Sequence, residues 1–224
     1  MSSLVLVTVM SPLLAAAVPL DSKLDAYVQA RVAEFDTIPE ERQKQLAKIS
    51  KFVRDTRAAG RPVRLTFICT HNSRRSHLSQ IWAKVAGAHY GIEVETFSGG
   101  TEATAFNPRA VATLRRAGFA IAEPGDEKNP RYQVKYSDKA EPLVCFSKKY
   151  DQSPNPSADF CAVMTCSDAD KKCPVVSGAT IRIPVPYEDP KVSDNTDKEA
   201  ATYDERSRQI AREMLYAMSL VDAK

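Results

Sequence analysis

Cys69, Arg75 and Ser76 are the residues of this sequence whose types and spacing are best suited to chemistry. A largely apolar segment, 65–68, ends at the cysteine, five residues follow before the arginine, and a helical pattern begins there. In a strand–loop–helix of this kind, backbone N–H groups can converge on a tetrahedral anion at the helix N-terminus, where the dipole favours negative charge. The arginine adds a planar fork for two anion oxygens. The spacing therefore predicts an oxyanion cradle, lined by Thr70, His71, Asn72, Ser73, Arg74 and Arg75.

The same positive field would lower the pKa of the Cys69 thiol, so we expect a nucleophilic thiolate near neutral pH. The alternative is a buried structural cysteine that happens to precede two arginines. The strand–loop–helix context is what the anion chemistry requires, and it favours the reactive cysteine.

A second pair of cysteines, Cys166 and Cys173, follows a predicted buried strand at residues 160–165. The segment between them, SDADKK, is polar and offers no apolar anchor, so we expect it to loop out and let the two sulfurs meet. Two other interpretations stay open, namely incidental thiols in a surface loop or half of a metal cluster. No histidine or cysteine stands at zinc-like spacing, so no metal site is expected. Cys145 and Cys161 lie within apolar segments and are expected in the core.

The composition is that of an ordinary folded protein with room for one α/β core and an appendage. The chain has 224 residues, of which 43% are apolar and 26% charged. The net charge of +3 is mild, and no basic stripe is interleaved with aromatic residues, so no nucleic-acid partner is expected. Five cysteines are an odd number for a secreted disulfide framework, which favours reduced thiols.

The first 21 residues contain an apolar run of signal-peptide length, with Ala15 to Ala17 as a candidate cleavage site. No positively charged residue precedes this run, and it is too short and, at Pro12, too interrupted to span a membrane. Residues 1–21 are therefore interpreted as a signal peptide, an overextended start or a disordered tail. We expect a cytoplasmic protein with no membrane partner, whereas cleavage of residues 1–17 would indicate export to the periplasm.

Residues 22–60 have the pattern of two amphipathic helices. Apolar residues recur at helical spacing at Leu24, Tyr27, Val28, Val32 and Phe35, and then at Leu46, Ile49, Phe52 and Val53. Thr37, Pro39 and Glu40 predict an N-cap, a helix-starting proline and a capping glutamate for the second helix, which ends near Gly60. The segment carries no residues of chemical note, and we expect a packing accessory or a dimerisation element.

From residue 61 onward the sequence alternates between strand and helix patterns. Strands are expected at 63–68, 92–98 and 160–165, helices at 76–88, 107–118 and 198–220, and a strand or hairpin at 132–136 with 143–146. The alternation predicts a mostly parallel sheet with helices on both sides, in one domain over residues 61–224. Because ligands bind beyond the carboxyl ends of such strands, Cys69 and Cys166 should lie at the same edge.

Three groups of residues carry a family resemblance. They are Cys69, Asn72, Ser73, Arg75 and Ser76 in the loop, Ser98-Gly99-Gly100 after the second strand, and Asp189-Pro190 near the end. With these residues, the segment 61–221 resembles the low-molecular-weight protein tyrosine phosphatase superfamily, and more closely its thioredoxin-coupled arsenate reductases. The resemblance implies a three-layer α/β fold with a parallel sheet, preceded here by the N-terminal helical hairpin.

The resemblance also implies a role for each matching site residue. Cys69 would be the nucleophile, Arg75 would hold the oxyanion, and Asp189 would be the general acid. Ser76 would hydrogen-bond the thiolate and help to keep it ionised, and Asn72 would brace the loop. No cofactor is implied.

Three positions depart from the pattern of the family. His71 replaces the usual loop glycine, which matters if that position needs a positive φ. Arg74 stands where a second loop cysteine is common, so it adds positive charge and removes a disulfide partner. Gln80 occupies a position that is acidic in some of the reductases and helps to bind potassium there, so potassium binding stays open.

Two enzymatic reactions share the first step, which is attack by the Cys69 thiolate on a tetrahedral oxyanion. A phosphatase then needs only Asp189 and water. A reductase needs two electrons from sulfur, so Cys166 would attack Cys69, and Cys173 would pass the disulfide on to thioredoxin. The segment KVSDNTDKEA after Asp189-Pro190 contains no aromatic residue, and Tyr187 is the only ring near it in the sequence, which favours a small inorganic oxyanion over phosphotyrosine.

The sequence thus predicts a thioredoxin-regenerated arsenate reductase, with the catalytic residues Cys69, Arg75, Ser76, Asp189, Cys166 and Cys173. One alternative is a phosphatase of the same fold, acting on phosphotyrosine or small phosphate esters. The other is a non-catalytic oxyanion-binding or redox-sensing module, in which His71 and Arg74 would have disabled turnover.

Overall fold

The strands that carry the candidate site form an all-parallel sheet. In the computed structural model, which describes residues 18–125, 127–172 and 175–222, the strand order is β2–β1–β6–β7. The strands are β1 (Arg64–Cys69), β2 (Glu95–Gly100), β6 (Phe160–Met164) and β7 (Ala179–Pro184). β1 pairs with a parallel strand on each side, with Cys69 opposite Gly100 and Ile68 opposite Met164. The predicted parallel sheet is confirmed, and the carboxyl ends of β1 and β6 are neighbours.

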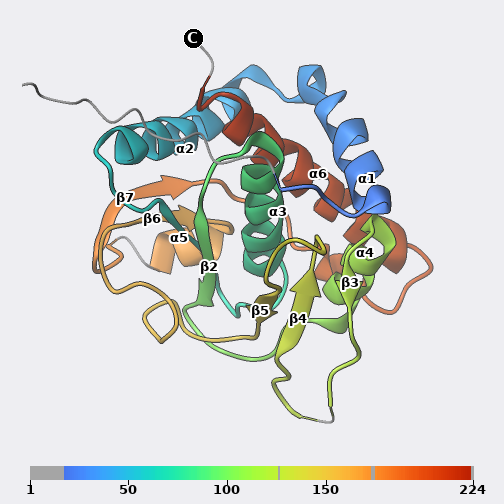
Figure 1. Ribbon diagram of the computed structural model, residues 1–224. Coiled ribbons are helices and arrows are strands. Elements are labelled where there is room, and N and C mark those ends of the chain that lie inside the picture. Colours follow the sequence, from blue (N-terminus) through green and yellow to red (C-terminus); the bar gives the residue numbers. More distant parts are fainter. Residues whose placement is uncertain (1–17, 126, 173–174, 223–224) are drawn as a thin grey trace, which may run out of the picture.

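Helices cover both faces of this sheet, but unequally (Figure 1). The helices concerned are α3 (Arg75–Tyr90) and α6 (Glu199–Ser219) on one face and α5 (Ser167–Lys172) on the other. On β1, Leu65 and Phe67 belong to the main core with α3 and α6, whereas Ile68 belongs to a smaller core under α5. The predicted three-layer arrangement is therefore confirmed, with a thick helical layer on one side and a thin one on the other.

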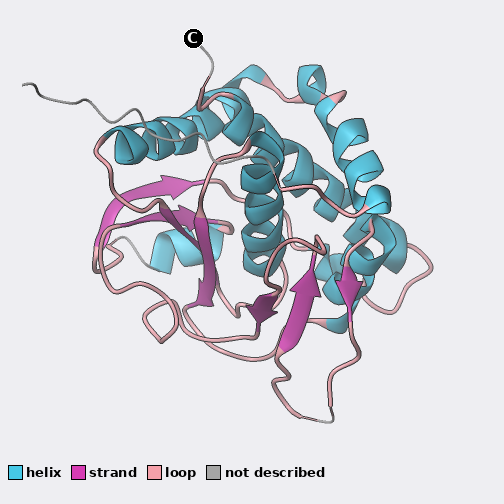
Figure 2. Ribbon diagram, in the orientation of Figure 1, coloured by secondary structure: helices cyan, strands magenta, loops and turns pink. Residues whose placement is uncertain are grey.

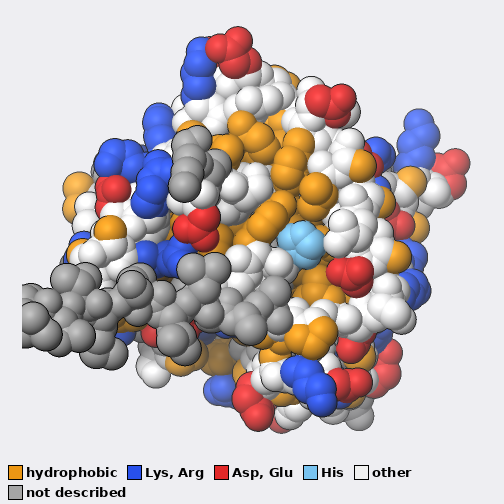
Figure 3. Space-filling model, turned by 45° about the horizontal axis from the view of Figure 1, so that its top comes forward, with side chains coloured by type: hydrophobic (Ala, Val, Ile, Leu, Met, Phe, Trp, Pro, Cys, Tyr) orange, Lys and Arg blue, Asp and Glu red, His pale blue; other side chains and the backbone are white. Residues whose placement is uncertain are grey.

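The helices predicted between residues 22 and 60 are present as α1 (Ser22–Val32) and α2 (Glu40–Ala58), joined through the 3₁₀ turn η1 (Phe35–Thr37). Both helices pack against α6, and their buried residues, such as Leu24 and Leu46, join the main core of the sheet. The hairpin is thus packed on the α/β layers and shares their core. On the face at the top of Figure 1, hydrophobic side chains gather in the middle and charged side chains lie around them (Figure 3).

The predicted side-chain N-cap of α2 at Thr37 is wrong. The Thr37 hydroxyl donates to the carbonyl of Glu34 at 2.6 Å, so it serves η1 instead. α2 begins at Glu40, directly after Pro39, and no side chain caps it. The fixed φ of proline suits the start of a helix, and here it sets the boundary without a capping box.

A small antiparallel sheet stands beside the parallel one (Figure 2). The strand pair predicted at 132–136 and 143–146 is present as β4 (Tyr132–Lys135) and β5 (Leu143–Cys145), and β3 (Ala120–Ile121) adds a third strand. The helix expected at 107–118 is α4 (Pro108–Ala117). Its N-cap is Asn107, whose side chain accepts a hydrogen bond from the Arg109 N–H at 2.9 Å.

Two elements differ from the expectations. The segment SDADKK forms α5 rather than a polar loop, because Ala169 is fully buried in the smaller core and its N–H donates to the Cys166 sulfur at 3.3 Å. The sequence pattern does not indicate β7, because this edge strand buries only Ile183 among its residues.

Two of the predictions fall outside the described residues, namely the interpretation of residues 1–17 as a signal peptide and the role of Cys173. Among the described helices, none combines the length and the apolar composition needed to cross a membrane.

Candidate active site

Cys69 ends β1 at the head of the loop, and its sulfur lies 3.0 Å from the hydroxyl oxygen of Ser76, in the first turn of α3. The side-chain N–H of Asn72 donates to the same hydroxyl oxygen at 2.9 Å. Because Asn72 occupies an acceptor position of Ser76, the hydroxyl proton is free to point at sulfur. The expected contact between Ser76 and Cys69 is present, and the Asn72 bond leaves the Ser76 proton available to a Cys69 thiolate.

Asn72 braces the loop, and it is the loop residue whose backbone has a positive φ, of 45°. Its side-chain oxygen accepts from the backbone N–H of Lys148 at 2.9 Å. Asparagine tolerates this left-handed backbone better than most residues do. His71 does not have a positive φ, and its ring extends outward to within 3.6 Å of the Glu102 carboxylate. Histidine at the usual glycine position therefore imposes no backbone strain.

The loop carbonyls are turned outward and held there. Those of Cys69 and Thr70 accept from the N–H groups of Thr101 and Glu102 at 3.2 and 2.8 Å. The carbonyl of His71 accepts from the Ser147 hydroxyl at 3.0 Å, and that of Ser73 accepts from Asn107 N–H at 2.9 Å. In a trans peptide the N–H points opposite to the carbonyl, so the N–H groups that follow these carbonyls face inward. This is the arrangement that an oxyanion cradle requires.

Gly100 makes this close packing between β2 and the loop feasible. A Cβ atom on Gly100 would lie 2.6 Å from the Thr70 oxygen and 2.7 Å from the Asn72 nitrogen. Such distances are too short for any side chain, so glycine is needed where the two backbones meet. Gly100, the last residue of the Ser98-Gly99-Gly100 motif, therefore supports the loop from its side.

Asp189 lies against both arginines of the loop. Its carboxylate accepts from Arg74 Nε at 2.8 Å and from Arg75 Nη2 at 2.9 Å. Burial alone would raise the pKa of Asp189, but the charges of Arg75 and Arg74, with a hydrogen bond from Lys191 N–H, lower it overall. Asp189 is thus ionised in the empty site. Together these groups line a shallow depression formed by Cys69, His71, Ser73, Arg74, Arg75 and Asp189.

Arg74 and Arg75 are both turned to protein acceptors in this state. Besides its bond to Asp189, Arg75 donates through Nη1 to the backbone carbonyl of Tyr187 at 3.0 Å. Arg74, which the sequence predicts to line the oxyanion cradle, donates two hydrogen bonds to the Asp189 carboxylate.

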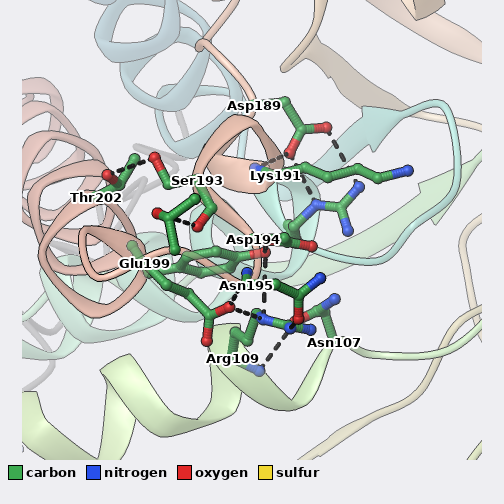
Figure 4. Close-up of polar contacts among 12 residues, drawn as sticks. Asn107, Arg109, Asp189, Lys191, Ser193, Asp194, Asn195, Glu199 and Thr202 are labelled. Atoms are coloured by element: carbon green, nitrogen blue, oxygen red, sulfur yellow. Dashed lines mark hydrogen bonds and ion pairs between the residues drawn. The ribbon is translucent and has the colours of Figure 1, made fainter.

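Several hydrogen bonds and ion pairs hold the segment that follows Asp189 in place (Figure 4). Arg109, at the start of α4, donates to the Asn195 side-chain oxygen at 2.8 Å and pairs with Glu199 at 2.6 Å. The Tyr203 hydroxyl donates to Asp194 at 2.8 Å. These contacts hold the segment that follows Asp189 between α4 and α6.

Cys166 lies near the same edge of the sheet as Cys69, two residues past the end of β6. Its sulfur is fully buried and is 3.5 Å from the hydroxyl oxygen of Thr70, the residue that follows Cys69. The expectation that Cys69 and Cys166 share an edge is confirmed. Cys145 and Cys161 lie in the core as predicted, and burial raises the pKa of Cys145 to about 12 and raises that of Cys161 as well.

Sequence reasoning missed contributions that come from the backbone. The sequence draws attention only to the ring of Tyr187, yet its carbonyl accepts from Arg75, and the N–H of Lys148 donates to the Asn72 side chain. No side-chain pattern signals such contacts. Gln80, which departs from the family's pattern, is buried and donates to the Thr96 carbonyl at 3.0 Å. Within the described ranges, no three His, Cys, Asp or Glu side chains gather as metal ligands would.

Comparisons with known proteins show what the chain is similar to. No protein-family model matches the chain. Among curated proteins, it is 31% identical over 142 residues to the arsenate reductase of Bacillus licheniformis, a match that covers 63% of this chain and 84% of that protein. Among solved structures, it is similar to a low-molecular-weight protein tyrosine phosphatase from T. tengcongensis, with a TM-score of 0.47, 15% identity and coverage of 70% and 98%. It is also similar to a thioredoxin-dependent arsenate reductase from Corynebacterium glutamicum, with a TM-score of 0.39, 19% identity and coverage of 88% and 86%.

Proposed function

Because the chain belongs to the arsenate reductase family, we propose that it reduces arsenate to arsenite with electrons from its own cysteines. The observation that carries this proposal is the pair of thiols, Cys69 and Cys166, near the ends of neighbouring parallel strands. Thr70 links them, since it follows Cys69 in the chain and its hydroxyl is 3.5 Å from the Cys166 sulfur. A phosphatase has no chemical use for the second thiol.

In the first step, the Cys69 thiolate attacks arsenic(V) in the cradle, an As–S bond forms, and one arsenate oxygen leaves as water. The inward N–H groups of the loop and the Arg75 guanidinium balance the charge on the remaining oxygens. The Ser76 hydroxyl, 3.0 Å from sulfur, stabilises the thiolate before the attack.

Asp189 protonates the departing oxygen. Its carboxylate is ionised beside Arg74 and Arg75. When an oxyanion draws Arg75 into the cradle, Asp189 loses one cationic partner and gains an anionic neighbour, and both changes raise its pKa. The carboxyl group then takes up a proton brought in by the arsenate and returns it to the leaving oxygen.

In the second step, the Cys166 thiolate attacks the Cys69 sulfur. The new S–S bond forms as the S–As bond breaks, and the electron pair of that bond stays on arsenic, which leaves as arsenite. Two thiolates have then given up two electrons, which is the number that arsenic(V) needs to become arsenic(III).

Cys173 completes the proposed relay by attacking Cys166 and freeing Cys69. In the sequence, Cys173 directly follows α5, the helix that begins after Cys166. The resulting Cys166–Cys173 disulfide is then reduced by a thioredoxin-type dithiol. We propose a cytoplasmic location for the same reason, because such reductants are abundant there.

Arsenate turnover with thioredoxin, thioredoxin reductase and NADPH tests the proposal. We expect Cys69→Ser, Cys166→Ser and Cys173→Ser each to abolish multiple turnovers, because each removes one member of the relay. Cys161→Ala, which removes a thiol from the core, serves as the control and should stay active. Full arsenate turnover in Cys166→Ser and Cys173→Ser would refute the relay.

Hydrolysis of p-nitrophenyl phosphate distinguishes the phosphatase alternative from arsenate reduction. A phosphatase of this fold would need Cys69 but neither Cys166 nor Cys173. Efficient hydrolysis that survives both of the latter substitutions, together with absent arsenate reduction, would favour that alternative.

A further inference from the structure

We infer that Arg42, on the N-terminal helical hairpin, is a positioning residue for Arg75 and acts through Tyr187. The inference rests on the proposed oxyanion cradle, because it explains how the arginine of that cradle is held. It also gives the helical extension at residues 22–60 a part in the chemistry, although none of its side chains lines the site.

The first link is a buried ion pair between α2 and α6. Arg42 Nε donates to the Glu213 carboxylate at 2.8 Å, and the Glu213 side chain is only 2% exposed. The other carboxylate oxygen of Glu213 accepts from the Gln209 side chain at 3.0 Å. A buried pair of this kind adds little net stability, since both charges lose their hydration, but it fixes the geometry of its partners.

The second link is the contact of Arg42 with the Tyr187 ring. The guanidinium carbon lies 4.7 Å from the centroid of that ring, which is a cation–π arrangement, and Tyr187 is buried. Burial, reinforced by the charge of Glu213, raises the pKa of Tyr187 well above its ordinary value, so the phenol stays neutral. The ring is thus fixed by a cation that comes from the hairpin.

The third link joins Tyr187 to the cradle through its backbone. The Tyr187 N–H donates to the Thr165 carbonyl at 3.1 Å, and its own carbonyl accepts from Arg75 at 3.0 Å. Two residues further on, the Asp189 carboxylate accepts from the same guanidinium at 2.9 Å. Both of these acceptors for Arg75 therefore lie on the short segment that the Tyr187 ring anchors.

The direction of the effect follows from this chain of contacts. If Arg42 no longer packs on the ring, the Tyr187 segment gains freedom, and Arg75 loses a fixed acceptor on it. A misplaced guanidinium binds a tetrahedral oxyanion less well, and a displacement of about 1 Å can cost about 100-fold in rate. Loss of Arg42 should therefore weaken oxyanion binding even though Arg42 touches no oxyanion.

Protection of Cys69 by inorganic phosphate measures this effect without requiring arsenate reduction. The full-length protein is alkylated with iodoacetamide at increasing phosphate, and the Cys69 peptide is quantified by mass spectrometry. In the double variant Arg42→Met/Glu213→Gln, both charges of the buried pair are removed together, which avoids an uncompensated buried charge. We expect its half-protecting phosphate concentration to rise about tenfold, equivalent to about 1.4 kcal/mol.

A matched control comes from another ion pair between the hairpin region and α6. Arg208 and Glu34 pair at 2.8 Å and touch neither Tyr187 nor Arg75. The double variant Arg208→Met/Glu34→Gln makes the same chemical changes, and its half-protecting concentration should stay within twofold of the wild type. An equal rise in this control would overturn the positioning role, because the effect would then be a general loosening of the hairpin.

Tyr187→Leu and Tyr187→Phe keep the inference open to refutation even if the Arg42 variant does not fold. Tyr187→Leu removes the ring and should raise the half-protecting phosphate concentration. Tyr187→Phe keeps the ring and should leave that concentration at the wild-type value. Wild-type protection in a folded Arg42→Met/Glu213→Gln variant or in Tyr187→Leu would contradict the inference. Failure of phosphate to protect wild-type Cys69 would instead refute the cradle itself, and the relay with it.

Discussion

Replacing Gly100 with alanine tests whether the backbone geometry of the loop performs the oxyanion chemistry. Gly100 stands opposite Cys69 in the β1–β2 pairing, and it has no direct chemical role. A methyl group added there would meet the carbonyl oxygen of Glu102 and the backbone of the loop, at the Thr70 oxygen and the Asn72 nitrogen. The substitution therefore displaces the cradle without removing any of the side chains that we assign to catalysis.

The size of the displacement follows from the contact distances. The Glu102 oxygen would be 2.2 Å from the new Cβ, the Thr70 oxygen 2.6 Å and the Asn72 nitrogen 2.7 Å, whereas ordinary contact begins near 3.4 Å. The backbones that meet there must therefore shift by about 0.7 to 1.2 Å. Because a misplacement of about 1 Å can cost about 100-fold, we expect kcat/KM for arsenate to fall about 30- to 100-fold, or about 2 to 2.7 kcal/mol.

Two other glycines provide matched controls in the same assay of arsenate kcat/KM and thermal midpoint. At Gly99 an added Cβ would meet the Tyr150 Cα at 2.3 Å, so Gly99→Ala should destabilise the fold through a contact outside the loop. At Gly125 nothing lies within 4 Å of the added Cβ, so Gly125→Ala should be neutral. The reasoning fails if Gly100→Ala stays within threefold of the wild type, or if Gly99→Ala loses as much activity at an equal loss of stability.

Three further predictions concern side chains near the cradle. Arg74→Gln removes a cation that lowers the pKa of Asp189. That pKa then rises, so Asp189 of the free enzyme becomes protonated at a higher pH, and the acidic limb of the kcat/KM profile moves to higher pH. An unmoved limb would contradict the proposed role of Asp189 in proton transfer. Ser76→Ala removes a hydrogen bond to sulfur worth about 1 kcal/mol, so the rate of Cys69 alkylation by iodoacetamide at pH 7 should fall about fivefold, and an unchanged rate would argue against the bond. Cys145, whose pKa burial raises to about 12, should stay unmodified at pH 8 while Cys69 reacts, as peptide mass spectrometry can show.

The sequence predicts the parts of this fold in which pattern and chemistry coincide. The apolar run before Cys69, the spacing to Arg75 and the helix that follows can be recognised because strand, loop and helix each have a distinct composition. Asn107 before Pro108 gives the start of α4 correctly for the same reason, since side-chain capping is a local interaction.

The remaining parts depend on contacts between distant segments. Helix α5 forms because Ala169 fits a small core built by β1 and β6, which a polar hexapeptide does not reveal. The pairing of Arg74 with Asp189 joins residues 115 positions apart. The contact between Tyr187 and Arg75 is a hydrogen bond to the Tyr187 backbone carbonyl. Tertiary contacts of this kind override local preference, and no residue type signals them in advance.

Asp189 and an entering anion compete for the arginines of the loop. Its carboxylate accepts from Arg74 at 2.8 Å and from Arg75 at 2.9 Å, so neither guanidinium is left without a negative partner at a partly buried position. An entering anion must replace this carboxylate at Arg75, and a singly charged one gains no electrostatic advantage by the exchange. A doubly charged tetrahedral anion does gain, and it also fills the inward N–H groups of the loop. Phosphate should therefore protect Cys69 from iodoacetamide at far lower concentration than formate at the same ionic strength, and equal protection by the two would show that the exchange does not select for charge.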